Sequence, residues 1–273
     1  MNRLDIANLI IEKITAQAEA AKDMYADSVS NIGYFYIDNF LPTELATKVH
    51  DVFPHYNDMM LIGSKYNLRE YKYVTAQMNN CHPLLEETIF AFQDPRILDL
   101  IKEICDINSL YADENLYAGG ISLMHQGQFL NPHLDNSHEK DRKQWRVLNL
   151  LYYVTPDWHQ TNGGNLELWP DGIDNAQLTI DSAFNRLIVM ATHDGSWHSV
   201  SPITADKNRT CVSNYYFSDS ALKPTDQFHV TSFRGRPEQG VRDIALQADN
   251  ALRQSVRKLF PLGLVKTKQI YKK

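Results

Sequence analysis

A succession of short apolar runs between residues 117 and 219 constrains the fold of this chain more than any other feature of its sequence. The runs are separated by glycine, asparagine, aspartate and proline, which favour turns. They read AGGISLM, WRVLNLLYYV, NLELW, QLTI, RLIVMAT and TCVSNYYF. Short segments of this composition and spacing are typical of a compact antiparallel β-sandwich or jelly roll. We therefore predict a mainly β core over residues 117–219.

The segment before this core has helical patterns. In the first thirty residues, apolar side chains recur at three- and four-residue intervals, which predicts an amphipathic helix. These side chains are Ile6, Leu9, Ile10, Ile14, Ala18, Ala21 and Tyr25. Residues 33–41, GYFYIDNFL, combine aromatic and β-branched residues over a short span and predict one strand. Asp94 followed by Pro95 predicts a helix start, because the carboxylate can cap free amides and proline has no amide to leave unpaired.

After residue 228 the strand pattern fades, and GVRDIALQADNALRQSVRKLF returns to helical periodicity. With 273 residues and 43% hydrophobic content, the chain can bury one large core. We therefore expect a single domain in three parts. Residues 1–116 form a helical N-terminal support, 117–219 the β core, and 220–273 a C-terminal helix with a basic tail.

Composition also excludes several classes of protein. No run approaches the roughly 18 apolar residues of a membrane span, and the N-terminus MNRLDIANLIIEK mixes charges into its apolar stretch, unlike a signal peptide. We therefore expect a soluble, cytoplasmic protein. The three cysteines Cys81, Cys105 and Cys211 form no C-x-x-C pair, so neither a disulfide framework nor a zinc cluster is indicated.

The net charge of −6 argues against nucleic acid as an obligate partner, but it conceals a basic C-terminus. From Ala251 to Lys273 there are two arginines, five lysines and no acidic residue. Two interpretations remain open, a solvated tail or a patch for an anionic surface such as the inner membrane or a phosphorylated substrate. The sequence does not indicate an oligomeric state.

The strongest chemical signal is a pair of metal-ligand residues in the segment NPHLDNSH. His133 and Asp135 are two apart, so on or beside an extended strand their side chains point the same way and can share a metal. Two histidines and one carboxylate on one face of Fe(II) leave three adjacent positions free, as a bidentate keto acid and dioxygen require. Alone, the pair is a weak signal.

Further along the chain, two segments supply a second histidine ligand and an arginine for the keto acid. In RLIVMATHDGSWHSVSPI a β-branched strand ends in a turn and is followed by His198, immediately before Ser-Val-Ser-Pro. Eleven residues later comes Arg209, and a buried guanidinium can bind the distal carboxylate of 2-oxoglutarate through two parallel hydrogen bonds. Ser213, four residues on, would share its strand face and could add a hydroxyl contact.

In this order the motifs HLDN, LLYYVTPDW, GGNLELWPDG, HSVSP and NRTCVSNYYF resemble those of the prolyl 4-hydroxylase type of 2-oxoglutarate/iron(II) dioxygenase. That family carries H-x-D, a strand ending in a Tyr-Leu-Asn-Asp-Trp-like turn, Gly-Gly, His-x-Val-x-Pro and an arginine. The resemblance spans roughly a hundred residues, from Gly119 to Asp219. The sequence departs from the pattern at MHQGQF, where a tyrosine-containing turn is usual, which leaves the roles of Met124 and His125 open.

The resemblance implies a double-stranded β-helix of the jelly-roll or cupin-like kind, with N-terminal helices and a C-terminal helix. It implies His133, Asp135 and His198 as iron ligands and Arg209 as the 2-oxoglutarate anchor. Tyr153 and Ser213 fall where the family places hydroxyls on the co-substrate. The implied cofactors are Fe(II), 2-oxoglutarate and O2, and ascorbate is allowed as an addition.

Several residues have alternative interpretations. His193 ends the same strand as His198 and could replace it as a ligand, although the following Val-Ser-Pro favours His198. Tyr152 and Tyr153 face opposite ways, so only one can reach the pocket, and we favour Tyr153. Trp145 could lie in the core or line the substrate entrance. Trp169 is expected in the core. Three other histidines, His125, His138 and His159, are expected at the surface or beside the site and not as ligands.

The resemblance also implies the reaction, in which 2-oxoglutarate is converted to succinate and CO2 while an unactivated C–H bond is oxidised. Halogenases of this superfamily replace the carboxylate ligand with glycine or alanine, so the presence of Asp135 favours hydroxylation. A small molecule or glycolipid is the expected substrate. The alternatives are a lipopolysaccharide sugar of the Kdo type at the membrane surface, a prolyl or other protein residue, or binding without catalysis, because fold does not fix function.

Overall fold

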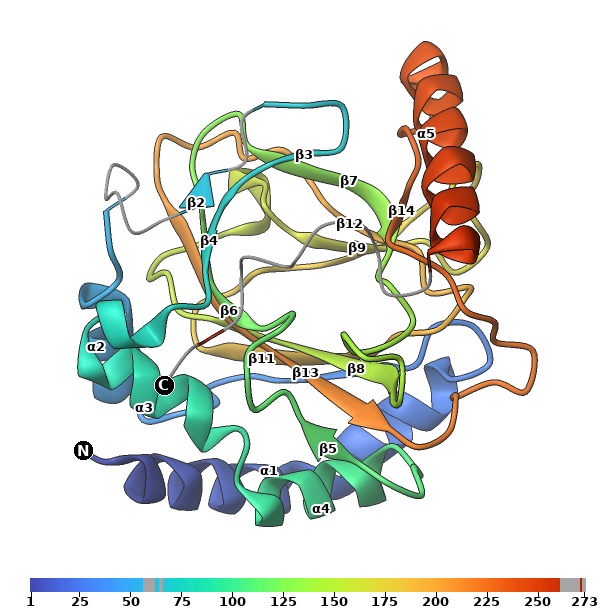
Figure 1. The fold of residues 1–273 in the computed structure, drawn as a ribbon. Helices are drawn as coiled ribbons and strands as arrows, with labels where there is room; N and C mark the ends of the chain where they lie inside the picture. Colours follow the sequence, from blue (N-terminus) through green and yellow to red (C-terminus); the bar gives the residue numbers. More distant parts are fainter. Residues whose placement is uncertain (56–61, 64–65, 261–270, 272–273) are drawn as a thin grey trace.

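The computed structural model describes residues 1–55, 62–63, 66–260 and 271. Its core is a pair of facing antiparallel sheets (Figure 1). Among the described residues, the larger sheet has the order β1-β11-β8-β13-β6-β4-β2, with β5 paired to β13. Its strands are Tyr34–Ile37 (β1), Ile62–Gly63 (β2), Tyr73–Thr75 (β4), Tyr111–Ala112 (β5), Gly120–Met124 (β6), Trp145–Tyr153 (β8), Arg186–Ala191 (β11) and Arg209–Ser218 (β13).

The smaller sheet carries the residues of greatest chemical interest. Within the described ranges its order is β10-β9-β12-β7-β14, with β3 paired to β7. Its strands are Glu70–Tyr71 (β3), Phe129–Leu134 (β7), Leu166–Leu168 (β9), Leu178–Ile180 (β10), His198–Val200 (β12) and Ser232–Phe233 (β14). The two sheets confirm the predicted double-stranded β-helix core with flanking helices.

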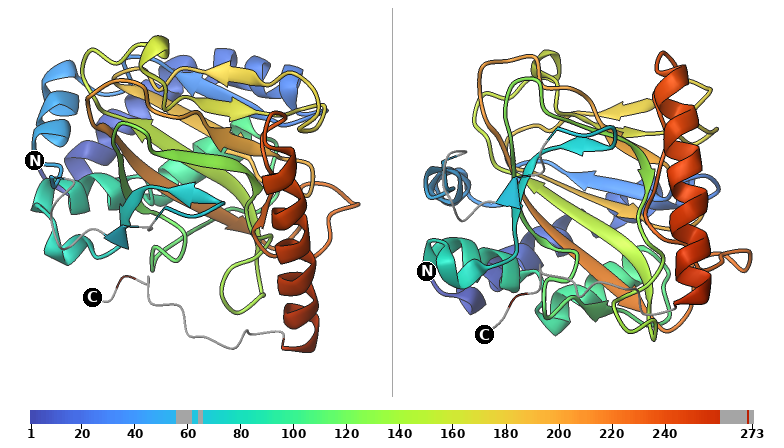
Figure 2. Two further views of the ribbon diagram at one scale, coloured as in Figure 1. Left: turned by 90° about the horizontal axis from the view of Figure 1, so that it is seen from above. Right: turned by 45° about the horizontal axis from the view of Figure 1, so that its top comes forward.

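Helices cover the outer face of the larger sheet (Figures 1 and 2). They are α1 (Arg3–Ser28), α2 (Thr43–Asp51), α3 (Pro83–Ala91) and α4 (Pro95–Ile104). Five members of the predicted stripe of α1 are buried, namely Ile6, Ile10, Ile14, Ala21 and Tyr25, while Leu9 and Ala18 are half-buried. Ala7, which was not predicted, is buried as well. Asp94 caps α4 as predicted, because its side chain accepts a hydrogen bond from the amide of Arg96.

The sheets extend beyond the segment 117–219. Strands β1 to β5 come from the N-terminal part and β14 from the C-terminal part, and only β1 was expected there. Helix α5 (Gly240–Leu259) lies beside β14 at the edge of the smaller sheet (Figure 2). None of the helices within the described ranges combines the length and apolar character that a bilayer span requires. The lysines after residue 260 lie outside the described residues.

Candidate active site

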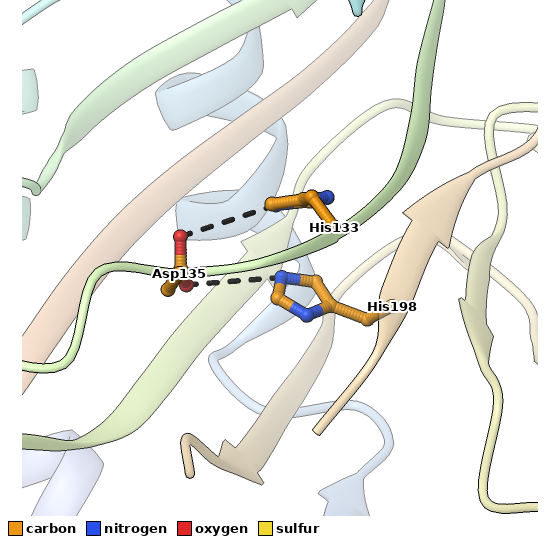
Figure 3. Close-up of side chains that lie close together, drawn as sticks. All are labelled: His133, Asp135 and His198. Carbon is orange, nitrogen blue, oxygen red and sulfur yellow. Dashed lines mark ion pairs between the residues drawn. The ribbon is translucent and has the colours of Figure 1, made fainter. Parts of the chain in front are cut away.

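His133, Asp135 and His198 come together between the two sheets (Figure 3). Strand β12 pairs with β7 in a register that sets His198 directly opposite His133. Asp135 follows the end of β7, and its two carboxylate oxygens lie 3.9 Å from His133 Nε2 and 3.7 Å from His198 Nε2. All three residues are at least nine-tenths buried. The sequence spacing that suggested a shared metal is therefore matched by a three-dimensional cluster.

Backbone carbonyls fix the orientation of both imidazoles. His133 Nδ1 lies 3.0 Å from the carbonyl oxygen of Asn131, and His198 Nδ1 lies 2.9 Å from that of Ser196. A carbonyl can only accept, so each Nδ1 carries the proton and donates. In this tautomer Nε2 is the nitrogen with the free lone pair, and it is directed to the cluster, the arrangement in which histidine binds a metal.

The protonation states also suit a metal ion. Burial, together with the proximity of His198, lowers the pKa of His133 to about 3, so this imidazole is neutral at physiological pH. Burial opposes ionisation of Asp135, but the positive charge of Arg146 helps to outweigh it, and the pKa of this carboxyl is lowered. Asp135 Oδ2 has no hydrogen-bond partner. Two imidazoles and a carboxylate fit the facial ligand set of Fe(II).

The ligand cluster opens into a cavity of about 280 Å³ between the sheets. The predicted co-substrate residues Arg209, Tyr153 and Ser213 line the same cavity. Its apolar wall includes Met124, Leu130, Leu151, Leu166 and Val200. The structure thus brings every predicted site residue to one enclosed space.

Arg209 is a buried guanidinium, 3% exposed. Its Nη1 donates to the carbonyl of Gly164 at 2.9 Å, and its Nη2 lies 3.2 Å from the sulfur of Met124. Among the ion pairs of the described residues none involves Arg209, and its Nε has no partner. A buried cation without a counter-ion is costly, so this arrangement is suited to an anionic ligand.

The two adjacent tyrosines of β8 differ as predicted. Tyr153 lines the cavity, its ring centroid lies 5.1 Å from the guanidinium carbon of Arg209, and its hydroxyl has no hydrogen-bond partner. Burial raises the pKa of Tyr153 to about 12, so the hydroxyl remains a donor. Tyr152 faces the helical layer, where its hydroxyl donates to Asn185 at 2.9 Å. Ser213 lines the cavity but donates to the carbonyl of Gly120 at 3.1 Å.

The Gly-Gly pair of the sequence motif leaves room for the arginine. Both glycines have a positive φ, +73° for Gly163 and +68° for Gly164. A Cβ on Gly163 would lie 2.0 Å from the carbonyl oxygen of Pro202, and one on Gly164 would lie 2.9 Å from Cδ of Arg209. A side chain at either position would therefore displace the backbone or the guanidinium.

The alternative ligands lie elsewhere. His193 Nδ1 already accepts a hydrogen bond from the amide of Gly195 at 3.0 Å, and the residue groups with Asp194 and Asp226 instead of the central cluster. His125 lies 3.0 Å from Asn208, at the end of β6.

Three further positions that the sequence left open are also settled by the structure. The ring centroids of His138 and Trp145 lie 4.1 Å apart with the rings tilted, which places Trp145 against this histidine and the core instead of in the cavity. His159 is exposed. Trp169 is buried, as expected.

One neighbour of the cluster was not anticipated. Arg146 is 6% exposed, its Nη1 lies 3.5 Å from Asp135 Oδ1, and its guanidinium packs over the ring of Tyr215 at 4.5 Å. Side chains alternate between the two faces of a strand, so counting back in steps of two from Tyr153 along β8 would predict that Val147 faces the site. A β-bulge between the pairs Tyr216–Leu148 and Phe217–Arg146 shifts the register, so Arg146 faces the site. Nothing in the sequence marks this bulge.

Comparison with known proteins also points to an iron site at this cluster. The family model of the 2OG-Fe(II) oxygenase superfamily matches residues 119–217. None of the curated proteins matches the sequence significantly. Among solved structures, a prolyl hydroxylase from Trichoplax adhaerens, in complex with a peptide of hypoxia inducible factor, is 21% identical. The similarity covers 74% of this chain and 91% of that chain, with a TM-score of 0.57.

Two other solved structures share the fold. A prolyl 4-hydroxylase from Phytophthora capsici is 17% identical, with 93% of this chain and 77% of that chain covered and a TM-score of 0.55. A prolyl-4-hydroxylase from Pseudomonas putida is 14% identical, with coverages of 72% and 97% and a TM-score of 0.51. The family match spans the residues of the buried ligand cluster and most of the cavity, and the superfamily requires Fe(II), 2-oxoglutarate and O2. The match to the 2OG-Fe(II) oxygenase superfamily over residues 119–217, together with the buried cluster of His133, Asp135 and His198, supports a 2-oxoglutarate-dependent dioxygenase.

Proposed function

We propose that the protein hydroxylates an unactivated C–H bond of a small-molecule substrate, with release of succinate and CO2. One observation carries this proposal. The three candidate ligands His133, Asp135 and His198 and the guanidinium of Arg209, which has no acidic partner among the described residues, line the same buried cavity. An iron site and an anion site so close together suit a metal-bound keto acid whose distal carboxylate extends to an arginine.

In this proposal each residue has a defined role. The two imidazoles and the Asp135 carboxylate hold Fe(II), which together with 2-oxoglutarate and O2 supplies the oxidant for the C–H bond. Arg209 binds the distal carboxylate of 2-oxoglutarate, and the Tyr153 hydroxyl donates a hydrogen bond to it. Ser213 adds a second hydroxyl, which exchanges its present bond to Gly120 for one to the co-substrate.

The chain's remaining contribution is positional. His133 and His198 lie on neighbouring strands whose ladder hydrogen bonds fix their separation before any ligand binds. The apolar side chains Leu151, Leu166 and Val200 keep water from the cavity, which strengthens the ion pair of Arg209 with the co-substrate. Retention of Asp135, where halogenases of the superfamily have glycine or alanine, supports hydroxylation.

The test is Fe(II)-dependent succinate release from 2-oxoglutarate, measured with and without pools of sugars, lipids and amino acids. We expect a basal rate that a true substrate raises, and a product one oxygen atom heavier than that substrate. Asp135→Ala is the inactive control. A product lighter by two hydrogen atoms would replace hydroxylation by desaturation. No succinate from the wild-type protein under any condition would favour the reading as a binding protein.

A further inference from the structure

An outer chamber lies beside the buried cavity and shares its ligand residues. This chamber, of about 420 Å³, is lined by His133 and Asp135 on its inner side and by α5 and the loop before β14 on its outer side. Its aromatic lining is Tyr117, Tyr215 and Phe233. A substrate that reaches the iron ligands while 2-oxoglutarate occupies the inner cavity has this chamber available. Figures 1 and 2 show α5 and β14 at the edge of the smaller sheet.

Positive side chains dominate the chamber. Its lining contains Lys72, Arg146, Arg253 and Arg257, against the two acids Glu70 and Asp135. Some of these cations are already paired. Lys72 lies 3.0 Å from Glu70, and Arg253 lies 2.9 Å from Asp249, outside the lining.

Arg257 differs from the other cations of the chamber. It is half-buried, and among the ion pairs of the described residues none includes it. Another cation, Arg142, lies beside it, and the Nη2 of Arg142 donates to the backbone carbonyl of Arg257 at 3.4 Å. Burial and the charge of Arg257 lower the pKa of Arg142, as expected for like charges in proximity. The region around Arg257 therefore has positive charge that the described residues do not neutralise.

The cofactors of the proposed function do not neutralise this excess of positive charge. The charges of Fe(II) and Arg209 are balanced by Asp135 and the two carboxylates of 2-oxoglutarate. Arg146 lies against Asp135, but it shares that carboxylate with the metal. The outer chamber thus keeps a positive potential in the loaded enzyme, and a low-dielectric wall concentrates such a potential.

We propose that the substrate is a small molecule with an anionic group, a carboxylate, phosphate or sulfate, and that Arg257 binds this group in the outer chamber. This inference rests on the proposed function and specifies its substrate class. A guanidinium can bind any of these oxyanions with two parallel hydrogen bonds. The anchored anion would hold the remainder of the substrate between Tyr117 and Tyr215, with its reacting carbon toward the iron ligands.

The same geometry changes the interpretation of the basic C-terminus. Both of its arginines lie on α5 and line the chamber, and Arg253 is further fixed through Asn250 at 2.8 Å and the carbonyl of Thr231. They are thus directed toward the active site. Lys258, the next residue, is exposed and does not line the chamber. It provides a control of equal charge on the same helix.

The first test uses inorganic phosphate as a probe of the chamber. The full chain is loaded with Mn(II) and 2-oxoglutarate, and paramagnetic broadening of the phosphorus resonance reports phosphate held near the metal. We expect Arg257→Gln to weaken this binding about tenfold or more, as loss of a charge-assisted hydrogen bond implies. Lys258→Gln should match the wild type. Equal affinity in wild type and Arg257→Gln, or no broadening in the wild type, would overturn the proposal.

The second test uses matched pairs of small molecules, each a carboxylate with its amide or a phosphate ester with its alcohol. The readout is succinate release, expressed as a ratio to each variant's own rate without substrate. We expect the charged member of at least one pair to raise this ratio and its neutral member not to do so, and the pair type identifies the anion. Arg257→Gln should lose the stimulation and Lys258→Gln should keep it.

Failure of this inference can be separated from failure of the proposed function. If neutral members stimulate as well as charged ones, or if an acidic peptide alone stimulates, the small-anion class is wrong while the hydroxylase assignment stands. If the wild-type protein releases no succinate at all, the proposed function is itself wrong.

Discussion

His198 lies directly opposite His133 across the antiparallel pair of β12 and β7, and the centroids of their rings are 4.1 Å apart. These two candidate ligands are on hydrogen-bonded strands, so they are held by the sheet, not by a loop. With each Nδ1 donating to a carbonyl, neither ring is free to turn its Nε2 away from Asp135. The protein itself therefore holds the side chains of the candidate metal site in place.

Removal of one of these ligands should strongly weaken metal binding. We expect His198→Ala to reduce the affinity for Mn(II) at least about a hundredfold, since loss of a mere supporting contact already costs 10–100-fold. His193→Ala is the matched control, because His193 is a buried histidine five residues before His198 whose Nδ1 accepts from the amide of Gly195. Calorimetric titration measures both. A larger loss in His193→Ala than in His198→Ala would show that the ligand assignment is wrong.

Substitution of Arg209 should separate 2-oxoglutarate binding from metal binding. Arg209→Ala leaves the distal carboxylate unpaired in a buried site, and truncation of one member of such a pair costs about 3–5 kcal/mol. The affinity for 2-oxoglutarate should therefore fall roughly a hundredfold or more, with Mn(II) affinity retained. Arg209→Lys should lie between the two, since it keeps the charge but not the paired hydrogen bonds. Unchanged 2-oxoglutarate affinity in Arg209→Ala would falsify the anchor.

The adjacent tyrosines allow a comparison on one strand. Tyr153→Phe removes a hydroxyl that has no partner in the protein, so it should cost little stability but lower 2-oxoglutarate affinity about tenfold. Tyr152→Phe removes the bond to Asn185, so it should lower the free energy of unfolding by about 1 kcal/mol and leave 2-oxoglutarate affinity unchanged. Titration and urea unfolding of both variants check this, and the reverse pattern would assign the pocket to Tyr152.

A buried ion pair fixes the segment that leads into α5. Arg236 Nη2 donates to Glu167 at 2.7 Å, and Glu167 also accepts from Ser199, the neighbour of His198. Arg236→Met leaves a buried carboxylate unpaired, so the free energy of unfolding should fall by about 3–5 kcal/mol.

Adding Glu167→Leu to that variant should recover much of the loss, because both charges are then absent. Urea unfolding gives both values. A double variant that is less stable than Arg236→Met would contradict this expectation, because Glu167 would then stabilise the fold even without its arginine partner.

Stability should decline with acidification through His193. Burial, then the charge of Lys223, lowers the pKa of this imidazole to about 4, against about 6.5 in an unfolded chain. Between these values the unfolded state binds more protons, so the contribution is complete above about pH 6.5 and is lost as the pH falls toward 4. The slope is at most about 1.4 kcal/mol per pH unit. His193→Gln should flatten the curve of unfolding free energy against pH, and an unaltered slope would contradict this.

Much of the site could be predicted because local chemistry determines it. The strands of the core are β-branched runs between turn residues, and six were predicted at their positions. A period of two sets His133 with Asp135 and Arg209 with Ser213 on shared faces, and the structure brings all four to one cavity. The short strands β7 and β12 were not predicted as such, because proline, asparagine and histidine in FLNPHL mask the usual strand composition.

The sequence by itself therefore determined the fold class, the candidate ligand set and the arginine of the inner cavity, since each depends on residue type and short spacing. Tertiary structure alone decided which residues surround them. A β-bulge turned Arg146 toward Asp135, and the pairing of β14 with β7 brought the loop before α5, and with it Arg257, to the outer chamber. Register and the packing of distant segments depend on the whole sheet, and no local pattern encodes them.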